Sequence, residues 1–203
     1  MYAKYFKRIL DFILSLIAII ILSPVFLIIA IAIKIDSKGP IFFLQERLGK
    51  DGKVFKIIKF RTMVVNAEHI GDGLKVKSEK DNRITKIGKI LRKTSLDELP
   101  QFVNVLKGDM TIIGPRPPVT YYPYKYEEYT EEQKNRFNVK PGITGLAQVK
   151  VRNSVSWDER IKIDLLYVKK VTFLSDIKIA ILTFISVFNK KGIYIEKERV
   201  KKS

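Results

Sequence analysis

Cysteine is absent from this 203-residue chain, and histidine occurs once, at His69. The lack of cysteine excludes disulfides, thiolate zinc sites and cysteine nucleophiles. A single histidine excludes a histidine-based metal site and disfavours a serine–histidine triad. Acidic residues are also few, because 21 Asp and Glu stand against 38 Lys and Arg, giving a net charge of +17. This excess of positive charge indicates a polyanionic partner: nucleic acid, anionic lipid headgroups or phosphorylated substrates.

Charge is also missing from the run between Ile9 and Ile33, which only Asp11 interrupts. A bilayer core takes roughly 20 apolar helical residues, so this run predicts a membrane segment. Ser23-Pro24 lies at its middle, and proline predicts a bend there. Each half is too short to cross the bilayer alone, and basic residues flank both ends. Residues 1–36 are therefore predicted to form a re-entrant helix-break-helix hairpin that returns to the cytoplasmic face. One kinked spanning helix is the alternative.

The remaining residues, 37–203, are enough for one cytosolic, membrane-associated catalytic domain with a real core. Its pattern predicts a mixed α/β (α+β) fold with surface amphipathic helices. A β-hairpin is expected from 41–45 and 53–63, with a turn signal between them, and a short strand at 147–151. At 171–188 apolar residues recur every three or four positions, which predicts either an amphipathic helix at the membrane surface or a helix packed in the core.

The densest polar chemistry lies between Arg92 and Arg116, where Asp97 and Glu98 are adjacent. Two carboxylates at a helix start suit a phosphate enzyme, because one can attack phosphorus while the other holds Mg²⁺. The competing interpretation is structural. Ser95 and Glu98 have the spacing of a capping box, in which the side chain of each residue accepts a hydrogen bond from the backbone amide of the other. Spacing alone leaves both interpretations open.

Ordered motifs along the chain together resemble one family. They occupy residues 7–11, 23–24, 39–42, 55–63, 94–101, 106–110, 114–117 and 140–145. Among them are Thr-Ser-Leu-Asp-Glu-Leu-Pro-Gln at 94–101 and Gly-Pro-Arg-Pro at 114–117. From Lys7 to about Val187 the chain resembles the bacterial sugar transferases, the small monotopic phosphoglycosyl transferases. The resemblance implies transfer of a sugar-1-phosphate from a UDP-sugar to polyprenyl (undecaprenyl) phosphate, with release of UMP. That is the first membrane step of bacterial surface glycan assembly.

The resemblance also implies roles for individual residues. Asp97 resembles the nucleophile that forms a phosphosugar-aspartyl intermediate, and Glu98 resembles the ligand of the Mg²⁺ cofactor. Arg92 and Arg116 resemble phosphate and nucleotide contacts. Four further substrate-binding candidates could each instead stabilise the fold: Lys59, Arg61, Asp109 and Gln148.

The implied location is the cytoplasmic face of the bacterial inner membrane, where anionic phospholipids would attract the basic chain. A non-catalytic, membrane-anchored protein that binds polyanions or recruits partners in a glycan-assembly complex is the alternative function. Nucleic-acid binding is not expected, because only the charge supports it. The sequence does not say which UDP-sugar is used, which glycan is built, or whether the chain forms a homodimer.

Overall fold

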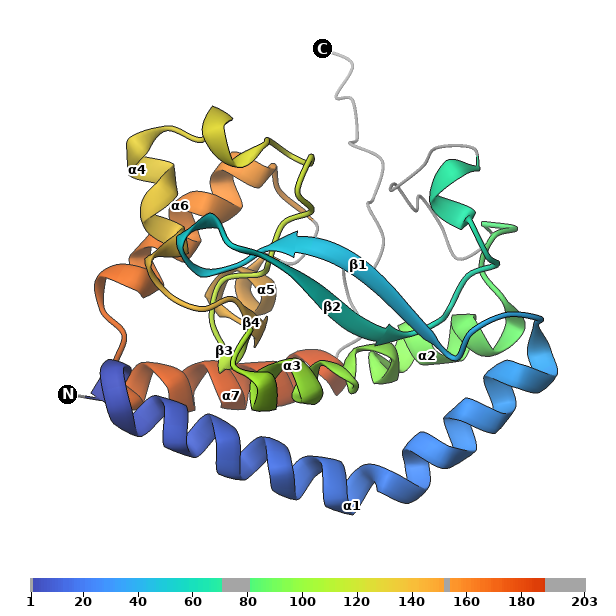
Figure 1. The fold of residues 1–203 in the computed structure, drawn as a ribbon. Coiled ribbons are helices and arrows are strands. Elements are labelled where there is room, and N and C mark those ends of the chain that lie inside the picture. Colours follow the sequence, from blue (N-terminus) through green and yellow to red (C-terminus); the bar gives the residue numbers. More distant parts are fainter. Residues whose placement is uncertain (1, 71–80, 152–153, 189–203) are drawn as a thin grey trace, which may run out of the picture.

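A computed structural model describes residues 2–70, 81–151 and 154–188. The helices are α1 (Lys7–Asp36), α2 (Lys86–Thr94), α3 (Gln101–Lys107), α4 (Glu131–Lys134), α5 (Leu146–Lys150), α6 (Trp157–Lys169) and α7 (Phe173–Phe188). The strands are β1 (Phe42–Leu48), β2 (Val54–Phe60), β3 (Thr111–Ile113) and β4 (Gly142–Thr144). α1 runs along the underside of the molecule, and the other elements lie above it (Figure 1). The predicted mixture of helix and sheet with a long apolar N-terminal helix is confirmed.

α1 is one bent helix. Its two arms rise toward the rest of the molecule from a bend near the middle (Figure 1), and Pro24 lies inside it. Proline removes a backbone donor and clashes with the carbonyl four residues earlier, which accounts for a bend. The structure differs from the predicted helix-break-helix, because the helix continues from Lys7 to Asp36. Among the described residues, the single helix long and apolar enough to cross a membrane is Tyr2–Asp36, and its most apolar window is 11% buried.

The predicted β-hairpin is confirmed. β1 and β2 pair antiparallel, from Phe42 opposite Phe60 to Leu48 opposite Val54. Their turn places Gly52 at a φ of +73°, in the left-handed region that glycine adopts at little cost. The hairpin extends from the C-terminal arm of α1 toward the opposite end of the molecule (Figure 1).

β3 and β4 form a second, parallel pair, in which Thr111 lies opposite Gly142. The backbones approach so closely that a Cβ on Gly142 would lie 2.1 Å from the backbone nitrogen of Gly114. The Gly142 amide donates to the carbonyl of Pro115 at 2.9 Å. The glycine therefore lets β4 hold the Pro-Arg-Pro segment that follows β3.

Both ends of α1 are tied to the domain above it. At the N-terminal end, the buried carboxylate of Asp11 accepts hydrogen bonds from the Thr111 hydroxyl and, at 3.2 Å, from the Ile112 amide. Arg8 donates to the carbonyls of Val105 and Leu106 at the end of α3. These contacts fix the first arm of α1 against β3 and α3.

The C-terminal end of α1 has its own ties. Asp36 accepts a hydrogen bond from the Ile87 amide in the first turn of α2 at 2.9 Å. Arg61 donates to the carbonyls of Ser37 and Lys38, just beyond the helix. The helix is thus held at both ends, and the segment between them is largely exposed.

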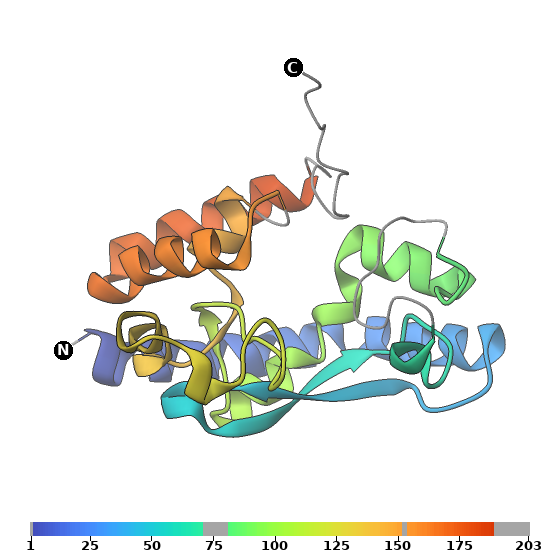
Figure 2. The ribbon, with the colours of Figure 1, turned by 90° about the horizontal axis from the view of Figure 1, so that it is seen from above.

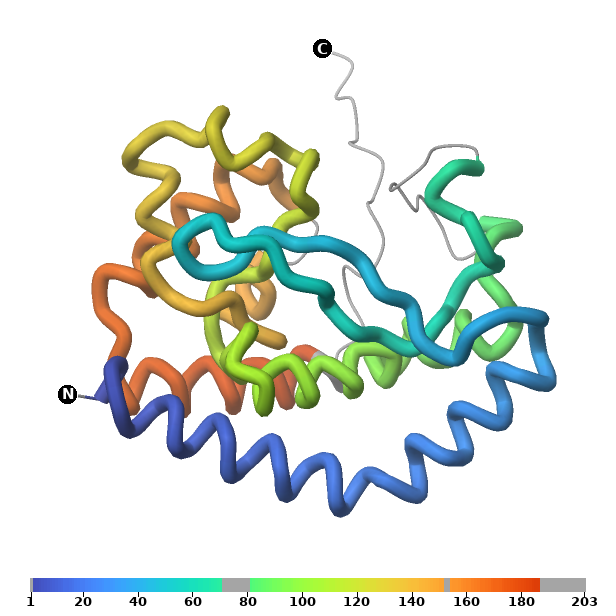
Figure 3. The backbone as a smooth tube through the Cα atoms, viewed as in Figure 1, coloured from blue at the N-terminus to red at the C-terminus, as the bar shows by residue number. Residues whose placement is uncertain are grey.

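α7 combines the two roles that its sequence left open. Ile179 is buried against Ile113 and Tyr167. The opposite face exposes large apolar side chains, namely Phe173, Leu174, Ile177, Ile181, Phe184 and Ile185. The start of α7 lies beside the start of α1 (Figure 3), where Lys7 pairs with Asp176 at 2.6 Å. Seen from above, α2 and α7 lie on one side of α1 and the β-hairpin on the other (Figure 2).

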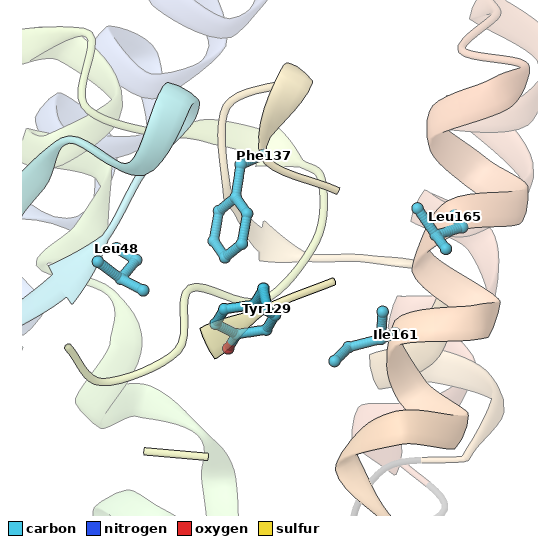
Figure 4. Packing of buried hydrophobic residues seen from close by; sticks show 5 residues of the cluster. All are labelled: Leu48, Tyr129, Phe137, Ile161 and Leu165. Carbon is cyan, nitrogen blue, oxygen red and sulfur yellow. The ribbon is translucent and has the colours of Figure 1, made fainter. Parts of the chain in front are cut away.

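A cluster of buried apolar residues joins the end of β1, the segment before β4, and α6 (Figure 4). Its members are Leu48, Tyr129, Phe137, Ile161 and Leu165. The strand predicted at 147–151 is wrong, because these residues belong mostly to α5, which packs against α6 and α7.

Candidate active site

The Asp97-Glu98 pair lies in a single turn of 3₁₀-helix, Leu96–Glu98, between α2 and α3. Ser95 ends α2 with a φ of +58°, and its amide donates to the carbonyl of Arg92 at 3.3 Å. Its side chain makes no capping hydrogen bond, so the predicted capping box is not formed. Pro100 precedes α3, where its missing amide costs nothing. The two carboxylates therefore occupy a tight corner between helices and do not serve as helix caps.

Glu98 points at two cations. Its Oε1 accepts from Lys59 Nζ at 2.6 Å and lies 3.4 Å from both terminal nitrogens of Arg116. Burial alone would raise the pKa of Glu98, but the charges and hydrogen bonds of Lys59 and Arg116 lower it to about 2. Burial lowers the pKa of Lys59 and the charge of Glu98 opposes this, so we take the pair as ionised at neutral pH.

Asp97 is placed differently. Within the described part of the chain, no hydrogen bond or ion pair engages its carboxylate. Burial is the main cause that raises the pKa of Asp97 to about 6; the charge of Glu98 acts in the same direction, and the charges of Lys59, Arg92 and Arg116 oppose it. Asp97 is therefore a half-buried carboxylate, ionised above about pH 6, whose oxygens are not committed to a protein partner. Those are the properties required of a nucleophile or a general base.

Asn104, which the sequence analysis did not select, positions Lys59. Its completely buried amide accepts from the Ile58 amide at 2.9 Å and donates to the Lys56 carbonyl at 2.8 Å. These bonds join α3 to β2 on both sides of Ile57, and the first of them holds the residue directly before Lys59. An amide at an apolar position of a helix is the sequence signal that indicates such a bridge.

Arg116 is positioned by a buried ion pair that the sequence analysis also missed. Arg136 donates to the backbone carbonyl of Arg116 at 3.0 Å and pairs with Asp164 at 2.7 Å. The side chains of Arg136 and Asp164 are 1% and 3% exposed. Removing one partner of such a pair leaves an uncompensated buried charge, which costs about 3–5 kcal/mol.

The predicted site residues divide into two groups. Asp97, Glu98, Lys59, Arg92 and Arg116 come together at the corner between α2 and α3. The other three have other partners in the described structure. Arg61 binds the residues after α1, Asp109 accepts from Asn104 at 3.2 Å, and Gln148 donates to the Ile143 carbonyl at 2.9 Å.

The acidic residues here fit Mg²⁺ only as a shared ion. Among the described residues, no three Asp, Glu, His or Cys side chains gather as a metal cage. Mg²⁺ is commonly held by one or two carboxylates together with water and substrate phosphates. Asp97 and Glu98 supply such a pair, and the neighbouring cations would attract the phosphates.

Comparison with known proteins shows which family this sequence resembles. A family model described as bacterial sugar transferase matches residues 2–190. The chain is 46% identical, over 87% of its length, to the galactosyl transferase CpsE of Streptococcus agalactiae serotype III. It is 43% identical, over 93% of its length, to a UDP-glucose:undecaprenyl-phosphate glucose-1-phosphate transferase of Klebsiella pneumoniae.

The chain spans 41% of each of these two relatives. The uncharacterized sugar transferase EpsL of Bacillus subtilis is nearer in length, with 40% identity over 92% of this chain and 89% of the relative. The similarity therefore extends across nearly the whole chain and corresponds to part of the longer relatives.

Proposed function

Because the chain belongs to the bacterial sugar transferase family, we propose that it transfers a sugar-1-phosphate from a UDP-sugar to polyprenyl phosphate and releases UMP. The observation that carries the proposal is the pairing of an uncommitted carboxylate, Asp97, with a carboxylate held by cations, Glu98. The reaction would begin the assembly of a bacterial surface glycan on its lipid carrier. The name of the Klebsiella relative describes a transfer of this type.

The proposed chemistry has two displacements at one phosphorus. An Asp97 oxygen bonds to the phosphorus that carries the sugar, and the bond from that phosphorus to the bridging oxygen breaks. The bridging oxygen keeps the electron pair and leaves with UMP. An oxygen of the lipid phosphate then attacks the same phosphorus, and the Asp97 carboxylate is released. A covalent intermediate splits one difficult step into two easier ones.

The neighbouring residues divide the remaining work. Lys59, Arg92 and Arg116 would bind the diphosphate and offset its charge near the carboxylates. Glu98, ionised down to low pH, would hold Mg²⁺, which supplies charge neutralisation on the phosphates when bound. In this arrangement the protein needs neither a thiol nor an imidazole.

We place the active site at the cytoplasmic face of the inner membrane, with α1 as a re-entrant helix. Two observations support this topology. Basic residues flank both ends of α1, and Asp11 and Asp36 tie the two ends to the same domain. A helix whose ends both bind one domain returns to the side from which it entered. The lipid phosphate would then reach Asp97 from the membrane.

The test is to trap the intermediate. The full chain in detergent or nanodiscs is incubated with a panel of radiolabelled UDP-sugars, Mg²⁺ and no lipid acceptor. We expect one donor to leave labelled sugar phosphate on the peptide that contains Asp97, detected by intact-mass and peptide mass spectrometry. Asp97→Asn should show neither label nor UMP release, while the matched exchange at the exposed Asp51, Asp51→Asn, should retain both.

Two outcomes would contradict the proposal at different levels. UMP formation with lipid acceptor but no adduct at any time would indicate direct transfer without an aspartyl intermediate. No UMP release from any UDP-sugar would instead favour the non-catalytic alternative, a membrane-anchored polyanion-binding scaffold.

A further inference from the structure

Two arginines outside the predicted site lie around Arg116. Arg47, in β1, donates to the carbonyl of Pro117, the next residue after Arg116, at 3.0 Å. Arg160, in α6, lies over the Trp157 ring at 5.2 Å from its centroid. Arg136, which bonds the Arg116 carbonyl, lies over the same ring at 5.9 Å. Arg47 and Arg136 therefore hold the Arg116–Pro117 backbone, Arg136 and Arg160 share the Trp157 ring, and Arg116 acts electrostatically on both Arg47 and Arg160.

The apolar cluster of Figure 4 explains why they converge. Three of the four arginines directly precede one of its members in the sequence: Arg47 precedes Leu48, Arg136 precedes Phe137, and Arg160 precedes Ile161. Because these apolar side chains pack together, the backbones of the arginines beside them are held close to the same cluster. The packing of the core therefore determines where these arginines lie.

The charges of this region are incompletely balanced. Asp164 neutralises Arg136. No carboxylate within the described ranges lies within ion-pair distance of Arg47 or Arg160, and the Nε of each is buried without a hydrogen-bond partner. Burial and, to a lesser extent, the positive charge of Arg116 lower the pKa of Arg47 to about 10, although Glu98 partly opposes this. The same two causes lower the pKa of Arg160, opposed in part by Asp164. Like charges held together in this way favour an anion between them.

We propose that Arg47 and Arg160, together with Arg116, form the subsite that binds the phosphate of the departing UMP. This inference rests on the proposed function. When the bridging oxygen leaves with its electron pair, the phosphate of UMP gains a second negative charge. Arg116 contacts Glu98 on the reacting side, so the added guanidinium groups stabilise the leaving group beyond it. Guanidinium groups suit this task because they bind phosphate oxygens in pairs.

The position of the subsite favours the nucleotide over the lipid phosphate. α6 and the turn of the β-hairpin lie above the N-terminal arm of α1, on the upper side of the molecule (Figure 1). An acceptor held in the bilayer would arrive from the side of α1, whereas a soluble product would leave from the opposite side. The same chemistry could bind either phosphate, so the experiment compares the two.

The test measures equilibrium binding of UMP, uridine and a short-chain polyprenyl phosphate to the full chain in nanodiscs, by calorimetry. Arg47→Gln and Arg160→Gln should each raise the Kd of UMP about tenfold or more and leave the Kd of the polyprenyl phosphate unchanged. Uridine, which lacks the phosphate, should bind all variants alike. Two exposed lysines provide controls that also remove one charge: Lys53→Gln, after β1, and Lys162→Gln, on α6, should change nothing.

Each other result is decisive. UMP that binds the wild type and both arginine variants equally would refute the subsite and leave the proposed function intact. UMP that fails to bind the wild type would count against the proposed function itself. A loss of polyprenyl phosphate affinity alone would assign the arginines to the acceptor. If Arg160→Gln does not fold, Arg160→Lys keeps the charge without the paired donors and should still weaken UMP binding at an unchanged melting temperature.

Discussion

Adjacent residues can have opposite properties when their surroundings differ, and Asp97 and Glu98 are an example. Lys59 and Arg116 hold Glu98 in its ionised form, with a pKa near 2. Asp97, with no such partner, has a pKa near 6 because burial disfavours its charge. One carboxylate thus has a fixed charge and the other keeps free oxygens, a division that suits a metal ligand beside a nucleophile.

The raised pKa of Asp97 has a consequence for stability. A carboxyl whose pKa is higher in the folded state favours folding when protonated, so its ionisation destabilises the fold as the pH rises from about 4 to 6. Asp97→Asn should therefore raise the melting temperature at pH 8, by an amount that corresponds to about 1–2 kcal/mol after allowance for solvent screening. The gain should shrink toward pH 4, as thermal unfolding across that range would show.

Asp51→Asn is the control for this measurement, because Asp51 is exposed and in a left-handed conformation that asparagine tolerates. The change there measures the effect of the same exchange at an exposed position. A lower melting temperature for Asp97→Asn at pH 8 would show that the charge of Asp97 stabilises the fold, as a helix cap would.

Activity should follow the same titration. If Asp97 attacks as the carboxylate, turnover should fall as the pH drops through about 6, because the protonated acid is not a nucleophile. Glu98, with a pKa near 2, should not contribute to this limb. A rate of UMP release that stays constant from pH 8 to pH 5 would count against Asp97 as the attacking group.

The residues of the site were only partly predictable. Asp97, Glu98 and Arg116 stand in unusual local sequences, which made them visible. Arg136 and Arg160 lie among other charged residues in stretches that resemble exposed helix faces, and only tertiary packing shows that Arg136 is buried. Conversely, the motif that contains Lys59 also contains Arg61, whose role in the structure is to hold the residues after α1.

At the scale of elements, prediction succeeded where local signals agree. The β1–β2 hairpin has both alternating apolar residues and a glycine turn. The failure at α5 is a short segment, Leu146–Lys150, whose apolar residues fit a strand or a buried helix equally well. For α1 the sequence predicted the bend but not the continuity, because proline in a membrane helix can be accommodated without a break.

The ties at the ends of α1 give a prediction about topology. Asp11→Ala removes the acceptor of two hydrogen bonds, one from Thr111 and one from the Ile112 amide, at a cost of about 1–3 kcal/mol. With the first arm released, we expect part of the population to place its N-terminus across the membrane. Single cysteines at Ala3 and Lys38, labelled from either side in cells, would measure this.

Without the Asp11 change, both cysteines should be labelled from the cytoplasm alone. Ile13→Ala, an exposed position on the same arm, should leave that pattern unchanged. Labelling of Ala3→Cys only from the far side in the otherwise unchanged chain would establish a spanning helix in place of a re-entrant one.

At the scale of the whole molecule, the exposed apolar side chains of α1 and α7 define where lipid contact is expected. Because the chain lacks cysteine, one introduced thiol can carry an environment-sensitive dye without competing labels. A dye at Leu174, 77% exposed on α7, should show blue-shifted emission in nanodiscs and be quenched by a lipid-soluble quencher.

A dye at Leu166, 60% exposed on α6, is the matched control and should emit as in water. Equal emission at the two positions would show that α7 does not face the bilayer and that its apolar surface has another partner.

The bent helix also imposes an order of events during synthesis. α1 leaves the ribosome before the elements that hold it, because Thr111 lies 100 residues after its partner Asp11, and Asp176 lies 169 residues after Lys7. At ordinary translation rates the second interval takes on the order of 10 to 30 s. During that time the apolar helix exists without the domain that fixes its ends. Its orientation is therefore provisional until the last third of the chain has been made, and a slow or stalled ribosome would prolong the interval in which it can insert the wrong way.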